Sequence, residues 1–345
     1  MTMVRAVVRR PLPARIVLAM AALALLAPIV AVFLGVVDIP PAHVIGVFLG
    51  QGPADARSII WDIRFPRIVT GMLAGVNLAV AGLLLQTVTR NPLADPSIMG
   101  ISQGATLAVS LFLLLSVYIH HAGSTDLPEL PVAWLPTVGT LGGLAAGGLV
   151  YALAFRRDLG PLRVTLCGIA VGAVLHALAI GLIAGWGSNR LEVLLEWLSG
   201  SLYARSWQHA AVLAPYTVSG LLVLPLIRRP LELLSLDASV AQSFGLAYRR
   251  QFSLALLLSC ALAASAVGTV GPIVFVGLVV PHLARSLAGR HSALVLPLTV
   301  ALGSIVVTFG DLVGRLLGRA EEIPIGVITA LFGVPVLVAL IRRTP

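Results

Sequence analysis

Long runs of apolar residues, separated by short polar segments, dominate the sequence. A helix needs about 20 apolar residues to cross the hydrocarbon core of a bilayer, and continuous runs favour helices over the alternating strands of a barrel. The predicted spans are 16–37, 68–88, 97–119, 135–155, 164–187, 210–227, 252–271, 273–289, 292–309 and 323–341. The pattern therefore predicts an all-α integral membrane protein with one transmembrane domain over 1–345.

The stretch 252–289 decides the number of spans, because it could be one helix or two. Gly271 and Pro272 stand in its middle, and proline interrupts the backbone hydrogen bonds of a helix. Basic residues favour the cytoplasmic side. With a cytoplasmic N-terminus, ten spans place most of the later arginines inside: Arg285, Arg290, Arg342 and Arg343. Nine spans would reverse this, so we predict ten spans with both termini in the cytoplasm.

The N-terminus also has features of a signal peptide, since arginines precede an apolar stretch. The run 16–37 is longer than the apolar region of a signal peptide and lacks a small-residue cleavage site. We interpret it as the first membrane helix.

Composition excludes several classes of function. The chain is 58% hydrophobic and 11% charged, against about 45–50% and about 25% for soluble domains. Its net charge of +9 comes from residues in the gaps between apolar runs, so topology explains it better than nucleic-acid binding does. All 23 basic residues are arginine. A P-loop needs a lysine, so this chain cannot hold ATP in that way.

No catalytic triad, paired acids or metal-ligand spacing stands out, so we predict neither an enzyme nor a metal site. Cys167 and Cys260 lie in separate apolar runs and are expected to pack as small hydrophobic residues. Glu321 and Glu322 precede the last span, where acids favour a helix N-terminus.

Polar residues inside spans are functional candidates by default. They are Asn77, Gln86, His176 and Asp311. Asp311 lies four residues before Arg315, which predicts an ion pair along one helix. A lone His176 is more often a packing residue than a ligand.

The segment between the second and third spans reads RNPLADP. Pro92 and Pro96 disfavour helix there, and Asn91 and Asp95 favour turns. The segment is either a stiff connection or a gate that moves as a unit.

The segment 228–251 is amphipathic, with apolar residues at helical spacing and arginines on both flanks. It either rests in the membrane interface or docks a cytoplasmic partner, and the residues alone leave both readings open.

The sequence contains a faint internal repeat. The first copy is LAGVNLAVAG followed by SIMGISQGA, and the second is SCALAASAVGTVGP followed by IVFVGL. The first copy enters from outside and the second from inside, as halves related by an inverted repeat would.

Several runs resemble the BtuC/FecCD-type permeases, from about Arg64 to the C-terminus: RFPR, RNPLADPSIMGISQGA, WLSGSLYARSW, GPIVFVGLVVPHLAR and EIPIGVITALFGVPVLVALI. The resemblance implies a BtuC-like type II ABC importer permease. Such a subunit works beside a second copy or a paralogue. Two cytoplasmic ATPase subunits carry ATP and Mg, and a periplasmic or lipoprotein binding protein delivers the substrate.

The resemblance also assigns residues. Outward-facing arginines that receive carboxylates of the binding protein match Arg64 and Arg315, which would be exposed. The gate region matches Asn91, Pro92 and Leu93, with Asn77 and Gln86 as further pathway candidates. Asn77 either faces the pathway or hydrogen-bonds to a neighbouring helix. The ATPase-coupling loop matches Leu236, Asp237, Ala238, Ala241, Gln242, Gly245 and Leu246.

These expectations describe an inner-membrane importer of a metal chelate, above all an iron–siderophore, working by alternating access. Haem and cobalamin are alternatives within the family. An ion-coupled secondary transporter is the rival from another class, and it would need an acid near mid-membrane, which no predicted span contains. A non-transporting membrane scaffold is the remaining rival.

Overall fold

The computed structural model describes residues 14–121, 132–155, 160–184, 197–289, 292–318 and 322–343. These residues form helices and connecting turns, with no strand among them. An all-helical architecture is expected in lipid, where each backbone polar group must be satisfied within its own segment.

The first half of the chain begins with α1 (Ala14–Phe33), α2 (Pro41–Phe48) and α3 (Ala54–Ser58). A π-helical turn, η1 (Ile59–Arg64), joins α3 to α4 (Phe65–Thr89). The remaining elements of this half are η2 (Pro96–Met99), α5 (Ile101–His121), η3 (Val132–Trp134), α6 (Leu135–Phe155) and α7 (Pro161–Ala184).

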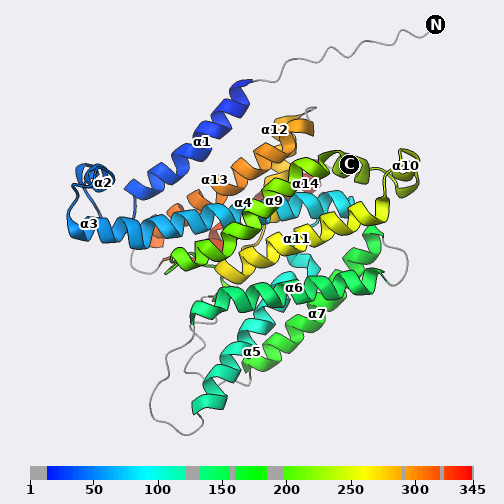
Figure 1. Cartoon of the computed structure of the whole chain (residues 1–345), viewed down its shortest axis with the longest axis horizontal. Helices are drawn as coiled ribbons and strands as arrows, with labels where there is room; N and C mark the ends of the chain where they lie inside the picture. Colours follow the sequence, from blue (N-terminus) through cyan, green and yellow to red (C-terminus); the bar gives the residue numbers. More distant parts are fainter. Residues whose placement is uncertain are drawn as a thin grey trace.

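The second half consists of α9 (Trp207–Leu234), α10 (Ala238–Ser243), α11 (Tyr248–Val270), α12 (Val276–Ala288), α13 (Ser292–Gly318) and α14 (Ile325–Arg343). Figure 1 shows α6 and α11 running roughly alongside α4 and α5 and α7 slanting obliquely, with α2 and α3 at one end of the molecule and α10 at the other.

The centre of the bundle is one continuous helix, Ala54–Thr89, made of α3, η1 and α4. In its most apolar stretch 83% of the residues are buried inside the protein. It packs against α13 and α11 most extensively, and also against α9 and α12. The helix with the least access to lipid is therefore the one that the others surround.

Two pairs of glycines let α4 approach its neighbours closely. A Cβ on Gly82 would lie 1.8 Å from the carbonyl oxygen of Gly277, at the start of α12. A Cβ on Gly75 would lie 2.2 Å from the carbonyl oxygen of Gly303 in α13. Small residues at helix contacts replace the hydrophobic driving force that lipid does not supply.

The stretch 252–289 contains two helices with a non-helical link at 271–275. Phe275, just before α12, has a φ of 69°. Tyr248 at the start of α11 and Arg285 near the end of α12 both contact side chains at the C-terminal end of α4. The chain therefore runs away from that end through α11 and returns to it through α12.

Six helices among the described residues are long and apolar enough to cross a membrane: Ala54–Thr89, Leu135–Phe155, Pro161–Ala184, Trp207–Leu234, Tyr248–Val270 and Ser292–Gly318. Four shorter apolar helices accompany them: Leu18–Phe33, Ile101–Ser116, Val276–Ala288 and Ile325–Ala339. The 13 residues of α12 rise only about 20 Å. The count of ten spans stays a prediction.

Two segments that the sequence shows as polar gaps between spans are largely helical. The gap 38–67 contains α2, α3 and η1, and it leads into α4 without interruption. Helix α9 continues to Leu234 despite three internal prolines, so the coupling segment 228–251 consists of the end of α9, then α10, then the start of α11. An ion pair between Arg228 and Glu232, four residues apart, supports the extension.

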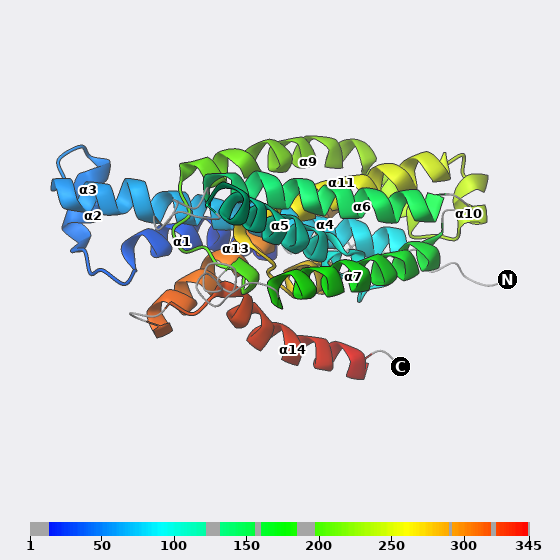
Figure 2. The same cartoon turned by 90° about the horizontal axis from the view of Figure 1, so that it is seen from below.

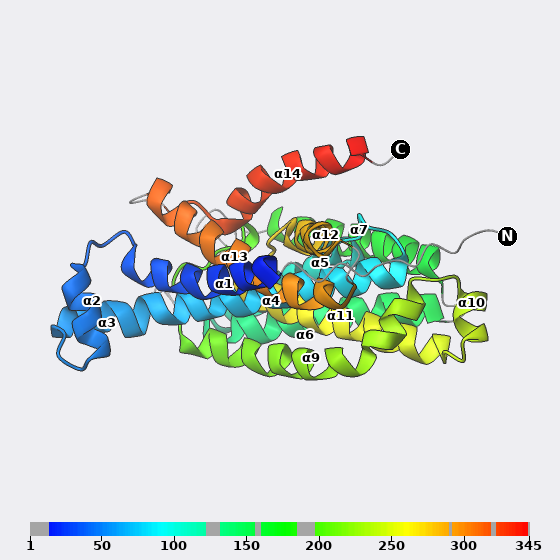
Figure 3. The same cartoon turned by 90° about the horizontal axis from the view of Figure 1, so that it is seen from above.

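Helix α14 slants away from the other helices, as Figures 2 and 3 show from opposite sides. It packs against α13 and α12, and an apolar cavity of about 420 Å³ lies between the three. Leu331 and Phe332 are 66% and 63% exposed. This surface suits lipid or another apolar protein surface.

Replacing Gly82 with alanine should lower the midpoint of thermal unfolding in detergent, because the added Cβ collides with a backbone carbonyl. We expect a loss of about 1–3 kcal/mol, as overpacking usually costs. Gly148 is the matched control, since a Cβ there meets nothing within 4 Å. Gly148→Ala should be neutral or stabilising, because alanine favours helix. Equal midpoints for the two variants would contradict the close contact.

Candidate functional site

The described polar side chains of α4 contact different elements at its two ends and its centre. Near its N-terminal end lies a group that we call the Arg67 cluster: Arg67, Asp311, Arg315 and Glu322. At its C-terminal end, Gln86 and Arg90 contact α12, α10 and α11.

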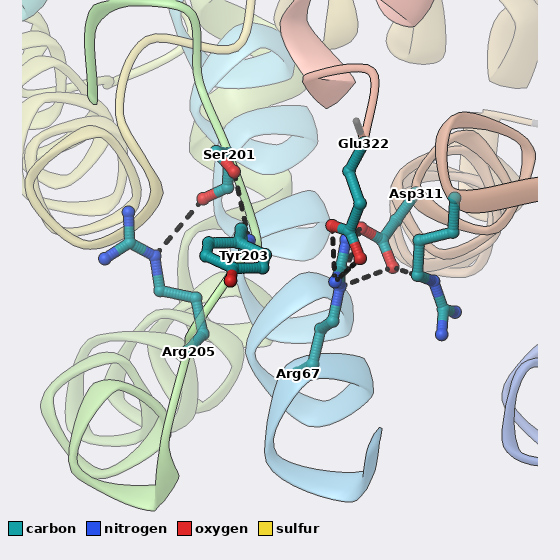
Figure 4. A network of polar contacts seen from close by, with 7 residues as sticks. Arg67, Ser201, Tyr203, Arg205, Asp311 and Glu322 are labelled. Carbon is teal, nitrogen blue, oxygen red and sulfur yellow. Dashed lines mark hydrogen bonds and ion pairs between the residues drawn. The ribbon is translucent and has the colours of Figure 1, made fainter. Parts of the chain in front are cut away.

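Arg67 is the centre of its cluster and joins three parts of the chain. Its Nη2 and Nε donate to Asp311 Oδ1 at 2.6 and 3.0 Å, and Nη1 donates to Glu322 Oε1 at 3.0 Å. Figure 4 shows the two carboxylates converging on this guanidinium. Arg67 and Asp311 are 8% and 5% exposed. A buried arginine needs such partners, because an unpaired buried charge is costly.

Arg315 shares the carboxylate of Asp311, as the spacing of four residues predicts. Its Nε lies 3.1 Å from Asp311 Oδ2. Arg315 is only 4% exposed, and its Nη2 makes no hydrogen bond to the described residues. The guanidinium therefore retains donor capacity for a further acceptor.

Arg64 lies at the same end but is bound by backbone oxygens. Its Nη1 donates to the carbonyls of Val32 (2.6 Å) and Phe33 (3.3 Å), and its Nη2 donates to Val37. These carbonyls lie at and beyond the C-terminus of α1, where cations are favoured. Arg64 is 3% exposed.

The expectation that Arg64 and Arg315 are exposed is therefore wrong for this chain, since both are buried. The sequence shows their charges but not the α1 carbonyls or the helix packing that covers them. Their proposed role in docking is untested and stays a prediction.

A non-helical stretch, 201–205, lies beside the Arg67 cluster in Figure 4. Tyr203 N donates to Ser201 Oγ at 3.0 Å, and Arg205 Nε donates to the carbonyl of Ser201 at 3.2 Å. The Tyr203 side chain is 54% exposed. This part of the WLSGSLYARSW run thus forms an ordered surface at the same end.

Asn77, in the middle of α4, is fully buried and donates to Ser265 Oγ of α11 at 3.1 Å. Of the two alternatives for this residue, the structure shows the hydrogen bond to a neighbouring helix. That Asn77 also borders a transport pathway stays a prediction.

Gln86 connects α4 to two other elements near its C-terminal end. Its Nε2 donates to a group of three carbonyl oxygens: Ala94 (3.3 Å), Gly277 (3.2 Å) and Leu278 (3.2 Å). Its Oε1 accepts from Arg285 Nη1 at 2.7 Å. The side chain thereby holds together α4, the turn that follows it and the first residues of α12.

The turn 91–95 is held by its own polar side chains. Asn91 Oδ1 accepts from the backbone N–H of Leu93 at 3.0 Å, and Asp95 Oδ1 accepts from the N–H of Ser97 at 2.8 Å. Burial raises the pKa of Asp95, because it removes water from the charged carboxylate. Asn91, Pro92 and Leu93 are exposed, and Pro96 begins the short helix η2.

The predicted coupling residues lie around α10 at this same end. Leu236, Asp237, Gln242 and Gly245 are exposed, whereas Ala241 is buried against the core. Ala238 and Leu246 are partly buried. Gly245 has a φ of 80°, a backbone conformation that glycine adopts without strain.

The remaining candidates, His176 and the two cysteines, form no cluster among the described residues. His176 is exposed on α7, and Cys167 and Cys260 are free thiols on different helices. Within the described residues no group of three or more histidine, cysteine or acidic side chains could hold a metal ion.

Sequence reasoning missed the partner of Glu322, which binds Arg67 three residues before α14 begins rather than stabilising that helix terminus. It also missed Arg90, whose partners are 147 and 158 residues away along the chain. Glu321 lies outside the described residues.

Comparisons with known proteins agree on one family. The sequence model of the FecCD transport family matches residues 23–343. The chain is 33% identical over 310 residues to the iron(3+)-hydroxamate import system permease protein FhuG of Bacillus subtilis, covering 90% of this chain and 91% of FhuG. It is 35% identical over 329 residues to the ferric enterobactin transport system permease protein FepD of Escherichia coli, covering 93% of each.

A solved structure resembles this one closely. It is described as an inward-facing conformation of a transporter assigned to the metal-chelate ABC type. The two match with a TM-score of 0.82 and 27% identity, over 96% of this chain and 99% of the other.

Replacing Asp311 with alanine should destabilise the protein strongly, because it leaves two buried arginines without their shared carboxylate. Breaking a buried pair in this way costs about 3–5 kcal/mol. The matched control is Glu232→Ala, which removes a half-exposed pair with Arg228 at 3.8 Å and should cost less than about 1 kcal/mol. Thermal unfolding in detergent compares the two. A change for Asp311→Ala no larger than the control would show that the cluster is not a structural unit.

Proposed function

The chain belongs to the FecCD transport family, and on that premise we propose that it is the membrane-spanning subunit of an ATP-driven importer for a ferric chelate. The observation that carries the proposal is the family match over nearly the whole chain, because relatives of similar length include FhuG and FepD. Those two proteins are named for ferric hydroxamate and ferric enterobactin, which are iron–siderophores.

The proposed topology has ten spans in the inner membrane, with both termini in the cytoplasm. The six long and four shorter apolar helices supply ten segments. The contacts of Arg90 put the turn 91–95 and α10 at one end of the bundle, and the Arg67 cluster lies at the other end of α4. We assign the α10 end to the cytoplasm because the flanks of α10 carry several arginines.

The proposed docking site for a substrate-binding protein lies at the opposite end. Arg64 contacts the carbonyls around the end of α1, and Arg315 lies beside Asp311 in the Arg67 cluster. The donor of Arg315 that makes no hydrogen bond supports a carboxylate as its acceptor. Because both side chains are buried, an acidic side chain of the binding protein would have to reach inward to contact them. Such a contact would fix the orientation of the docked protein more than it would attract that protein from a distance.

The proposed coupling site is α10 with its flanking residues, where two cytoplasmic ATPase subunits would bind. Exposed apolar side chains on and beside this short helix support a protein partner, among them Val240 (43%) and Phe244 (69%). Hydrolysis of ATP with Mg would take place in those subunits, and this chain would move the chelate by alternating access.

A second copy of the chain, or a paralogue, would complete the pathway. The exposed apolar surface of α14 supports a helix partner there. For an ion-coupled mechanism, Asp311 would be the first acid to consider, but its carboxylate is already shared by two arginines.

The function is tested by reconstituting the chain in proteoliposomes with the ATPase subunits and binding protein of its own genome. Radioactive iron is supplied as a ferric hydroxamate, ferric enterobactin or ferric citrate, beside haem and cobalamin. We expect ATP-dependent uptake of at least one ferric chelate. Replacing the P-loop lysine of the ATPase should abolish it. Uptake of haem or cobalamin alone would reassign the substrate, and uptake without the ATPase would overturn the importer class.

Arg315→Glu should weaken docking of the binding protein, because a glutamate cannot donate hydrogen bonds to the partner's carboxylate and repels it. The affinity should fall at least about 30-fold, as when one partner of a buried charge pair is removed. Arg64→Glu should act in the same direction. Arg57→Glu is the control, since Arg57 is an exposed arginine at the same end. Reversing the facing acid of the binding protein should restore affinity, which separates docking from misfolding. Unchanged affinity in both variants would refute the site.

A further inference from the structure

Arg90 occupies a backbone position that most residues avoid. It directly follows α4 with φ 51° and ψ 32°, the left-handed region. The N–H of Arg90 donates to the carbonyl of Thr87 and that of Asn91 donates to Gln86, the pattern that closes many helices. Glycine is favoured there, since a Cβ crowds the following carbonyl. An arginine at such a point indicates a use for its side chain.

The guanidinium of Arg90 joins both ends of the segment that carries α10. Its Nη1 donates to Asp237 Oδ1 at 2.5 Å, and its Nη2 donates to the hydroxyl of Tyr248 at 2.9 Å. Asp237 immediately precedes α10, yet its carboxylate makes no capping hydrogen bond to that helix. Tyr248 is the first residue of α11. Figure 1 shows α10 at this end of the molecule.

The residues after Arg90 form a turn that is held together by hydrogen bonds of its own. Asn91 accepts from the N–H of Leu93 within the turn, and the N–H of Ala94 donates back to the carbonyl of Asn91 at 3.1 Å. Gln86 holds the carbonyl of Ala94 from α4. A displacement of the Arg90 backbone therefore reaches the whole of 91–94.

The two contacts of Arg90 differ in exposure. The Asp237 side chain is 79% exposed, whereas Tyr248 is 6% exposed and its ring lies 5.7 Å from that of Phe252, tilted by 41°. An exposed ion pair contributes little to folding, so it can break and form again as α10 moves. The buried tyrosine provides the fixed point against which that movement acts.

We propose that Arg90 is a positioning residue that transmits displacement of α10 to the turn 91–95. The inference rests on the proposed function, because an ATPase bound at α10 would supply the displacement. It adds a direct route from the coupling segment to the gate residues 91–93, through Arg90, the first residue of the RNPLADP segment.

The link is tested first on the chain alone in nanodiscs. A thiol is placed in the turn by Leu93→Cys, with Cys167→Ser and Cys260→Ser removing the natural cysteines. Arg90→Glu should raise the rate of thiol labelling at residue 93 about fivefold, the upper limit for an exposed pair. Exchanging the charges, with Arg90→Glu and Asp237→Arg together, should return the rate to its starting value. An unchanged rate in Arg90→Glu would overturn the inference.

The functional test uses the reconstituted complex and measures ferric chelate imported per ATP hydrolysed. Arg90→Glu should lower this ratio about fivefold, and the charge exchange should restore it. Tyr248→Phe should also lower it. Tyr151→Phe is the matched control, because that hydroxyl bonds to Ser253 at the same end without joining α10 to the turn, and the ratio should not change.

The outcomes separate the inference from the function on which it rests. If the unmodified chain imports no chelate with the ATPase, the proposed function fails, and the labelling rates still decide the link. If the unmodified chain imports the chelate normally, two results would show that the inference is wrong while the function stands. One is that Arg90→Glu leaves the ratio of chelate imported to ATP hydrolysed unchanged. The other is that the charge exchange with Asp237→Arg fails to restore a lowered ratio.

Discussion

The burial of α4 on nearly every side is the constraint on which the rest of the structure depends. Lipid supplies no hydrophobic driving force for helices to associate, so packing must hold the neighbours against α4. Small residues such as Gly75 and Gly82 allow that close packing. A buried polar side chain on it is costly without a partner inside the protein. Arg67 reaches α13, Asn77 reaches α11 and Gln86 reaches α12. One helix therefore connects both halves of the chain, and the regions assigned to docking and gating lie at its two ends.

The sequence predicts the apolar helices well, because a bilayer imposes a length and a composition that can be read directly. The range 135–155 is a helix with the same bounds, and the break at Gly271 and Pro272 separates α11 from α12. The sequence is less informative where helices leave the apolar pattern. The segment 38–67 looks like a polar gap, yet it contains α2, α3 and η1. In 228–251 the helical spacing is visible in the sequence, but the extension of α9 to Leu234 is not.

The site is predictable only where the interaction is local. The spacing of four residues reveals the pair between Asp311 and Arg315, whereas the partner of Asp311 in α4 is 244 residues away. The burial of Arg64 depends on where α1 ends, which no motif shows. The chain's exclusive use of arginine fits these long-range contacts, because a planar guanidinium can hold two acceptors in fixed directions. Arg64 holds carbonyls, Arg67 holds carboxylates and Arg90 holds a carboxylate and a phenol.

The continuous helix Ala54–Thr89 has 36 residues, which corresponds to a rod of about 54 Å. Such a rod is longer than the hydrocarbon core of about 30 Å, so a helix of this length that spans the membrane also reaches beyond the core. Rocking it by about 5° would shift one tip relative to the other by about 5 Å, as the geometry of a rod of this length requires. A small tilt of this one helix would therefore displace the residues at its two ends in opposite directions.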